Sequence, residues 1–304
     1  MTGTALTRPR RVLIFANPTS GRGRGMEILT ALTPTLKREG WDAEARIEHP
    51  AHLQDIGDVE DIHALIVIGG DGTLRTVIER VGQLAGLANV PPTLVMGLGT
   101  ANLMQQHLGL VYDYSRLADD VADILRHRNT VLVDTSVAND RLFLLVASCG
   151  IDAAVVHELS SSRVGPITKL SYVAPALTAL KDYSFPKLSV EVDGAMILEN
   201  QHAMVFVGNV PEYGTGFPVL RKASSFDRRL DVCVMPCSTH HELVYLWLLT
   251  VAGKHTSWHR VKYTTGRDIR ITGDPAPMQI DGDAAAMTPA HIRLLEERIA
   301  FIVR

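Results

Sequence analysis

The amino-acid sequence predicts an N-terminal α/β domain followed by an antiparallel β domain, and two observations support this prediction. In the first half, short apolar runs alternate with glycine turns and helical patterns, which is typical of a parallel sheet with helical crossovers. From about Val131, short strand-like runs follow one another, separated by turn signals such as Asp193-Gly194, which favours antiparallel strands. We therefore expect a boundary near residues 128–130, with domains at 1–130 and 131–304.

The individual elements follow from these runs in chain order. In the first half, apolar runs predict strands at 12–16, 42–47, 64–68 and 92–96, and helical spacing predicts helices at 25–38, 74–81, from about 101, and at 117–126. The first helix, for example, carries apolar residues at Met26, Leu29, Leu32 and Leu36. In the second half we expect strands at 131–137, 142–148, 188–192, 203–208, 230–235, 268–271 and 277–280, and helices at 167–181 and 240–252.

Composition excludes several classes of protein. The 304 residues are 46% hydrophobic and 21% charged, as in a folded globular protein. The net charge of −3 gives no indication of nucleic-acid binding. Three cysteines are too few for a disulfide framework, which favours a cytoplasmic location. The best candidate for a membrane span, Leu243–Val251, has nine residues, whereas a spanning helix needs about 20.

The strongest local motif is Gly69-Gly70-Asp71-Gly72-Thr73, which lies between a buried strand and a helix. Glycines let the backbone approach a bulky ligand, and the amides at the start of the helix form an anion site that suits phosphates. Asp71 would then engage Mg²⁺ or orient a nucleotide. The alternative is a tight strand-to-helix turn that binds no ligand.

Two further segments follow strands in the same way. The segment 17–21 (NPTSG), with arginines at 22 and 24, suits a polyphosphate, although its spacing is not that of a Walker A loop and a solvated basic loop is the alternative. The segment 97–102 (GLGTAN) follows the fourth strand. Because open α/β sheets bind ligands at the carboxyl ends of their strands, the agreement of the three motifs predicts a phosphate-binding site there.

In this order and spacing, NPTSG, GGDGT and GTAN resemble the diacylglycerol kinase catalytic domain family. This family includes soluble bacterial lipid kinases and is related to sphingosine kinases and, remotely, to NAD kinases. The resemblance extends over about residues 11–303. Its later motifs are Gly165–Tyr172, Gly208-Asn209, Tyr213–Phe217, Asp227 with Leu230–Val232, Gly253–His255 and Asp281–Asp283.

The resemblance implies an ATP-dependent kinase that phosphorylates the hydroxyl of a lipid alcohol, with diacylglycerol as the expected substrate and phosphatidate as the product. It implies a Rossmann-like α/β domain and a C-terminal antiparallel β-sandwich, with the active site in the cleft between them. It also implies that the C-terminal end of the chain packs back on the first domain. The residues that would hold ATP are Asn17, Ser20, Gly69, Gly70, Asp71, Gly72, Thr73, Thr100 and Asn102.

The resemblance also implies the catalytic and metal-binding groups. Asp283 stands where the family has its catalytic glutamate and would accept the proton of the lipid hydroxyl, with Asp71 as the second catalytic carboxylate. Asp227 would coordinate Mg²⁺, with the backbone carbonyls of Ser224 and Arg229 as further ligands. Asp283 is one methylene shorter than glutamate, and a reach error of about 1 Å can cost about 100-fold in rate.

Other departures from the family pattern leave alternatives open. Phe226-Asp227-Arg228 replaces the family's DDG, and Arg75-Thr76 replaces N-E after GGDGT. Arg75 would either bind phosphate or cap a solvated helix face. The alternative functions are a sphingoid or other lipid alcohol kinase, a catalytically weak nucleotide- or lipid-binding homologue, and a NAD-kinase-like enzyme.

A lipid substrate implies transient peripheral contact with the inner surface of the membrane. The segment Leu243–Val251 is apolar most of the way round a helix, so it is either part of the core or a membrane contact. Exposed edge strands of the β domain would allow a homodimer.

Overall fold

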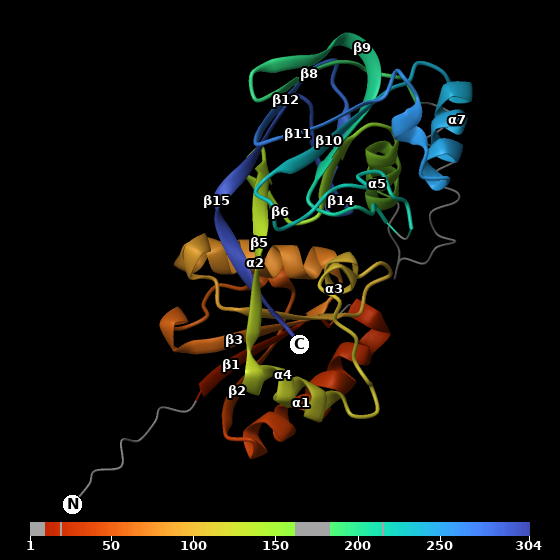
Figure 1. Cartoon of the computed structure of the whole chain (residues 1–304). Helices are drawn as coiled ribbons and strands as arrows, with labels where there is room; N and C mark the ends of the chain where they lie inside the picture. The colour runs from red at the N-terminus through yellow and green to blue at the C-terminus, as the bar shows by residue number, and fades with distance from the viewer. Residues whose placement is uncertain (1–9, 19, 162–182, 215) are drawn as a thin grey trace, which may run out of the picture. The chain divides into compact units, whose positions relative to one another are not determined.

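The computed structural model describes residues 10–18, 20–161, 183–214 and 216–304. The chain forms two compact units (Figure 1): unit 1 comprises Met1–Leu132 and Ile299–Arg304, and unit 2 comprises Val133–Arg298. The expected helix at 167–181 and the motif at 165–172 lie outside the described residues, as do Thr19 and Thr215 of two glycine-containing motifs.

Unit 1 is built on a parallel sheet in the order β4-β3-β1-β2. Its strands are β1 (Arg10–Ala16), β2 (Trp41–Ile47), β3 (Ile62–Gly69) and β4 (Thr93–Gly97). Its helices are α1 (Arg24–Arg38), α2 (Asp71–Ala85), α3 (Leu103–His107) and α4 (Leu117–His127). The chain passes from β1 outward to β2 and then to the other side of β1 for β3 and β4. The direction of winding therefore changes between β1 and β3.

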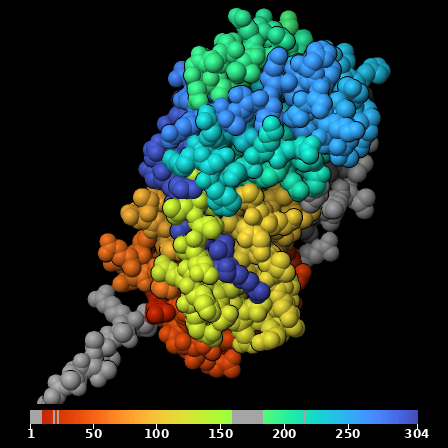
Figure 2. Space-filling view, in the orientation of Figure 1, coloured from red at the N-terminus to blue at the C-terminus, as the bar shows by residue number. Residues whose placement is uncertain are grey.

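The last residues of the chain pair with the sheet of unit 1. Phe301, in β15 (Ala290–Val303), pairs in parallel with Thr93 of β4 and is completely buried. Arg304 Nη2 lies 2.8 Å from Asp120 Oδ2 in an ion pair. Figure 2 shows the dark-blue C-terminal atoms among the yellow and lime atoms of unit 1. The chain thus returns to unit 1 after it has completed unit 2.

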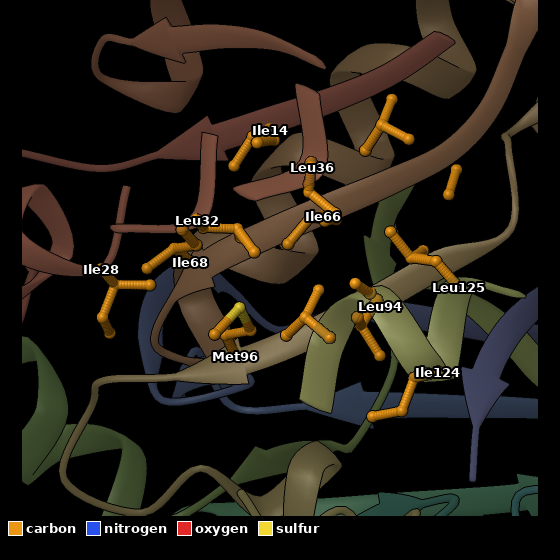
Figure 3. Close-up of a cluster of buried hydrophobic side chains, with 14 of the residues drawn as sticks. Ile14, Ile28, Leu32, Leu36, Ile66, Ile68, Leu94, Met96, Ile124 and Leu125 are labelled. Atoms are coloured by element: carbon orange, nitrogen blue, oxygen red, sulfur yellow. The ribbon is translucent and has the colours of Figure 1, made fainter. Parts of the chain in front are cut away.

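One face of the parallel sheet packs on α1 and α4. Alternate strand residues such as Ile14 and Ile66, which are register partners, point to this face and are completely buried. The cluster in Figure 3 contains Ile28, Leu32 and Leu36 from α1, Ile124 and Leu125 from α4, and Ile68, Leu94 and Met96 from the strands. Because β1, β3 and β4 are apolar at nearly every position, they need cover on both faces, as parallel strands usually do.

Unit 2 consists mainly of strands. They are β5 (Asn129–Ala138), β6 (Arg141–Phe143), β7 (Val146–Cys149), β8 (Lys187–Val192), β9 (Ala195–Gly208), β10 (Leu230–Pro236), β11 (Lys262–Gly266), β12 (Asp268–Gly273), β13 (Pro277–Ile280) and β14 (Asp283–Met287). Its helices are α5 (Ile151–Ser161) and α7 (His240–Val251). The long strand β9 pairs antiparallel with β8 along its first part and with β7 and β10 along its last part. The predicted fold class, an α/β domain followed by an antiparallel β domain, is confirmed.

The strand expected at 142–148 is in fact two strands, β6 and β7. The reason is a hydrogen-bonding partner far away in the sequence: the backbone N–H groups of Leu144, Leu145 and Val146 all donate to the Asp281 carboxylate, at 2.9 to 3.0 Å. These amides are therefore not used in a strand ladder at this point. The expected elements also lacked α5, β11, β14 and β15.

Candidate functional site

Three loops of unit 1 follow the carboxyl ends of neighbouring strands. Asn17 comes directly after β1, Gly69 ends β3, and Gly97 ends β4. Because the winding direction changes between β1 and β3, the first two loops lie where an open α/β sheet forms its ligand-binding crevice. The three motifs expected to bind phosphate are thus at one edge of one sheet.

The first two loops are joined by side-chain hydrogen bonds. Asn17 Nδ2 donates to Thr73 Oγ1 at 3.0 Å, and Ser20 Oγ lies 3.4 Å from the same hydroxyl oxygen. Thr73 is buried at the start of α2, so its hydroxyl is held in place by packing. Three predicted nucleotide-binding residues are therefore in one hydrogen-bonded cluster.

The second and third loops approach each other through their backbones. The Leu98 N–H donates to the Gly69 carbonyl at 2.9 Å. A Cβ atom at Gly99 would lie 2.9 Å from the Cα of Gly70, and one at Gly97 would lie 2.6 Å from the Asn102 side chain. Glycine is required at these positions because no other residue leaves room for the neighbouring chain.

Asp71 fixes the third loop to the second. Its Oδ2 accepts the Leu103 N–H at 3.0 Å and its Oδ1 accepts the Met104 N–H at 3.1 Å, at the start of α3. Burial raises the pKa of Asp71 above its ordinary value, and the N–H donors of Met104 and Leu103 act in the opposite direction. Both carboxylate oxygens are therefore engaged by the protein's own backbone.

The remaining unit 1 residues complete the third loop. Asn102 adopts a left-handed conformation with φ of 50°, and its Oδ1 accepts the Gly99 N–H at 2.6 Å. Thr100 is exposed on the same loop. Arg75, on α2, is buried and pairs with Glu79 at 3.2 Å, so the interpretation of Arg75 as part of a solvated helix face is wrong.

Asp283 begins the second strand of a tight hairpin in unit 2. The hairpin joins β13 to β14 through Asp281 and Gly282, whose φ values are 50° and 85°. Two positive φ values in a two-residue turn match the right-handed twist of the flanking strands. Ile280 and Asp283 are register partners, so the turn places Asp283 at the base of the hairpin.

Asp281 anchors this hairpin to the β6–β7 connection. As described above, its two oxygens accept three backbone N–H groups. Gln279 Oε1 adds a hydrogen bond from the Gly282 N–H at 2.8 Å. Asp281 therefore joins the turn beside Asp283 to the β6–β7 connection, a role that the sequence motif did not indicate.

The three expected metal-binding residues lie on an exposed loop before β10. Asp227 is exposed, and its Oδ1 accepts the Arg229 N–H at 3.1 Å. Ser224 Oγ accepts the Phe226 N–H at 3.3 Å. Arg228, which stands at the family's glycine position, has φ of 63°, and its guanidinium pairs with Glu296 at 2.9 Å.

The donors of this loop suit Mg²⁺ in chemical type. The Asp227 carboxylate and the backbone carbonyls are oxygen ligands, and Mg²⁺ in proteins is commonly held by one or two carboxylates together with water. Asp231 lies close by: burial raises its pKa, and the charge of Asp227 contributes to that increase. In the described part of the chain, no three His, Cys, Asp or Glu side chains gather into a metal site, so any magnesium would depend on carbonyls and water as well.

The sequence analysis missed one carboxylate of unit 2. Asp152, on α5, is half-buried, and its Oδ2 accepts a hydrogen bond from Ser148 Oγ. Ser148 Oγ also accepts a hydrogen bond from Gln279 Nε2 at 2.7 Å. Burial raises the pKa of Asp152 to about 6, although the Ser148 hydrogen bond lowers it. An acid within an apolar stretch, directly after Cys149-Gly150-Ile151, was the available signal.

Comparison with known proteins agrees with these two units. The diacylglycerol kinase catalytic domain matches residues 11–136, and the YegS C-terminal NAD kinase beta sandwich-like domain matches residues 145–303. The chain is 25% identical to a diacylglycerol kinase of Staphylococcus carnosus over 95% of this chain and 94% of that protein. It is 22% identical to a diacylglycerol kinase of Bacillus subtilis over 97% of this chain and 96% of that protein.

A solved structure supports the fold. The crystal structure of a diacylglycerol kinase from Bacillus anthracis superposes with a TM-score of 0.69, covers 98% of both chains and is 22% identical in sequence. The family domains together span nearly the whole chain, and the curated relatives match it at nearly full length. The chain therefore belongs to the diacylglycerol kinase family of lipid kinases.

Proposed function

We propose that this protein transfers the γ-phosphate of ATP to the hydroxyl of a lipid alcohol, and that diacylglycerol is the substrate and phosphatidate the product. Support comes from relatives that carry the name diacylglycerol kinase and align along nearly their entire length. The observation that carries the proposal is the cluster formed by the first two glycine loops, in which Asn17, Ser20 and Thr73 lie together at the winding change of the sheet.

In this proposal the three loops bind the nucleotide. Backbone N–H groups at Gly69–Thr73, where the 15-residue helix α2 begins, face the negative charge of the phosphates. Asn17, Ser20, Thr100 and Asn102 complete the nucleotide-binding set. Asp71 acts by holding the third loop against the second, because both of its oxygens accept backbone N–H groups.

Asp283 is the proposed catalytic base. It accepts the proton of the lipid hydroxyl while the hydroxyl oxygen forms a bond to the γ-phosphorus, and the bond from that phosphorus to the leaving ADP oxygen breaks. Asp227 and the carbonyls of Ser224 and Arg229 are the proposed ligands of Mg²⁺, which when bound supplies positive charge that offsets the phosphate charge. The contribution of the protein is mostly positioning.

The proposal is tested with ATP labelled at the γ-phosphate and a panel of acceptors in detergent micelles with Mg²⁺. Diacylglycerol, sphingosine and NAD are the acceptors. Label in phosphatidate is the expected result. Label in sphingosine phosphate would identify sphingosine as the substrate in place of diacylglycerol, and label in NADP would identify an NAD kinase. Binding of ATP with no labelled acceptor would overturn the kinase proposal.

Variants of Asp283 test the catalytic assignment. Asp283→Asn keeps the size of the side chain but removes the proton acceptor, so turnover should fall by at least about 100-fold while ATP affinity, measured by calorimetry, is unchanged. Near-normal turnover in Asp283→Asn would refute the assignment. Asp283→Glu restores the length found in the family, and a faster rate would show that the reach of Asp283 limits the wild-type enzyme.

A further inference from the structure

The helix α7 of unit 2 is apolar on its outer side as well as its inner side. Thr239 caps its N-terminus by accepting the Glu242 N–H. Leu243, Leu246 and Thr250 form the buried side. Neither this helix nor any other in the described residues is long and apolar enough to cross a membrane.

Five large apolar residues form the outer side, which we name the α7 apolar face. They recur three or four positions apart, so they make one continuous stripe along the helix. Each is between 49% and 56% exposed: Val244, Tyr245, Trp247, Leu248 and Val251. Figure 1 shows α7 at the edge of unit 2, and Figure 2 shows light-blue atoms of this part of the chain on the surface.

The fold of unit 2 does not account for this face. A surface helix needs one apolar stripe for the core and normally carries polar residues on the other side. In α7 the core stripe is already supplied by Leu243 and Leu246. A contiguous exposed apolar patch of this kind is typical of a surface that binds a membrane or another protein.

Aromatic and basic side chains adjoin the α7 apolar face at Tyr245 and beyond the end of the helix. The rings of Tyr245 and Trp258 meet edge to face with centroids 5.5 Å apart, and the Arg260 guanidinium lies 5.0 Å from the centroid of Trp258. Lys254 is exposed directly after the helix, and Arg221 donates to the carbonyl of Gly253.

The local charge is opposite in sign to the charge of the whole chain. The segment 238–262 contains three basic residues and one acidic residue, which gives +2 with histidine neutral. They are Lys254, Arg260, Lys262 and Glu242. Glu242 pairs with Arg260, and the rest of the chain brings the net charge to −3. The segment that carries the apolar face is therefore positively charged, whereas the whole chain is negatively charged.

We propose that the α7 apolar face inserts into the interfacial region of an anionic lipid bilayer and so brings the enzyme to its lipid substrate. This proposal rests on the proposed function, because a lipid substrate requires the enzyme to contact the membrane. Trp and Tyr favour the membrane–water interface, and an apolar face bordered by Lys and Arg is the pattern of helices that lie in the plane of an anionic membrane.

A second copy of this chain is the less favoured occupant. Two copies that met through the α7 apolar face would bring their basic borders together, and like charges oppose such an interface. An anionic bilayer neutralises the same charges. Charge complementarity therefore selects the membrane.

Cosedimentation with vesicles tests this proposal without depending on catalysis. The wild-type protein should bind vesicles of phosphatidylcholine mixed with phosphatidylglycerol, and bind more weakly to pure phosphatidylcholine and at high salt. Leu248→Ser should weaken binding by about tenfold, because it removes an exposed apolar side chain from the face. Lys254→Gln should weaken it by about fivefold.

Met196→Ser is the matched control. Met196 lies on β9 and, like Leu248, is 54% exposed, so its replacement removes similar apolar surface from a different place. Equal vesicle binding by wild type, Leu248→Ser and Met196→Ser would overturn the proposal. So would a dimer, seen by sedimentation velocity, that Leu248→Ser dissociates.

A kinase assay separates this proposal from the proposed function. With a short-chain, water-dispersed diacylglycerol, Leu248→Ser should retain the wild-type rate, whereas with diacylglycerol in anionic vesicles its rate should fall with its binding. Vesicle binding without any kinase activity would refute the proposed function but would still support the α7 apolar face as a membrane-binding surface. Kinase activity in a protein that does not bind vesicles would refute the proposed membrane-binding role of the α7 apolar face but not the proposed function.

Discussion

The glycine loops of unit 1 and the β13–β14 hairpin of unit 2 are held in different ways. The loops of unit 1 support one another through several contacts, among them the Asn17–Thr73 hydrogen bond, the Leu98–Gly69 backbone bond and the Asp71 carboxylate. In the region of the hairpin that carries Asp283, β13 pairs with β7, and one side chain, Asp281, accepts three N–H groups.

This difference indicates how each region tolerates change. Removing one side chain from the loops of unit 1 breaks one or two of their contacts, whereas removing the Asp281 side chain breaks three hydrogen bonds at once. In each region an acid that accepts backbone N–H groups lies next to residues with a proposed role. Asp71 lies among the residues proposed to bind ATP, and Asp281 lies two positions before the proposed catalytic base Asp283. Four substitutions test whether the two regions differ in this way.

Asp281→Ala is expected to have the largest effect. It leaves three N–H groups without their charged acceptor, so the free energy of unfolding should fall by about 4 kcal/mol. Asp281→Asn keeps an acceptor and tolerates the positive φ, so it should cost less than half as much. Urea unfolding measures both, and a loss below about 1 kcal/mol for Asp281→Ala would show that these three hydrogen bonds contribute little to stability.

Asp71→Ala should cost somewhat less, about 3 kcal/mol, because it leaves two N–H groups rather than three without an acceptor. The raised pKa of Asp71 reduces the loss further, since the ionised carboxylate is already disfavoured by burial. ATP affinity, measured by calorimetry on the folded variant, should fall because the third loop is no longer fixed. Unchanged ATP affinity would show that Asp71 is not needed to hold the nucleotide-binding loops.

Asp152→Asn should instead stabilise the protein at neutral pH. With a folded pKa of about 6 against an ordinary value of 3.8, the folded state retains a proton that the unfolded state has released, so stability falls as pH rises through this interval. The full penalty, up to about 3 kcal/mol, is present above pH 6 and absent at low pH.

The measurement for Asp152→Asn is urea unfolding of both proteins across this pH range. The advantage of the variant should grow from acidic to neutral pH and then remain constant. If the difference between the two proteins is independent of pH, the carboxylate is not held at a cost in stability. A large pH-dependent gain would show that unit 2 keeps the Asp152 carboxylate despite its cost in stability.

Gly21→Ala should have the smallest effect, about 2 kcal/mol. Gly21 has φ of 62°, and a Cβ atom there would lie 2.9 Å from the Cβ of Leu98 in the third loop. Gly23→Ala is the matched control, because Gly23 also has a positive φ but an open space around its Cβ position. Thermal unfolding should show a larger loss for Gly21→Ala, and equal losses would mean that the Leu98 contact contributes nothing.

Much of unit 1 could be predicted from local sequence. The apolar runs of β1, β3 and β4 stand apart from their surroundings, and each is followed at once by glycine or by Asn17, so strand ends and loops were located within a few residues. The reason is physical: parallel strands covered on both faces must be apolar throughout, and their turns need residues without bulky side chains.

The elements that were missed depend on partners far away in the chain. β15 contains Leu, Glu and Arg in a row, residues that favour a helix, yet it pairs with β12 and reaches β4 of unit 1. The break between β6 and β7 depends on Asp281, more than 130 residues away. Tertiary pairing overrides local preference at such places.

The sequence by itself determined the fold class, the positions of the three loops at the strand ends and the family, because these depend on local patterns of apolar, glycine and polar residues. The tertiary structure alone decided which backbone N–H groups the acids accept. Asp71 and Asp281 look like Asp283 in sequence, since each stands beside a glycine, but only folding shows that backbone N–H groups engage the first two. It likewise decided that the apolar segment 243–251 is only half buried, because exposure is a property of packing and not of hydropathy.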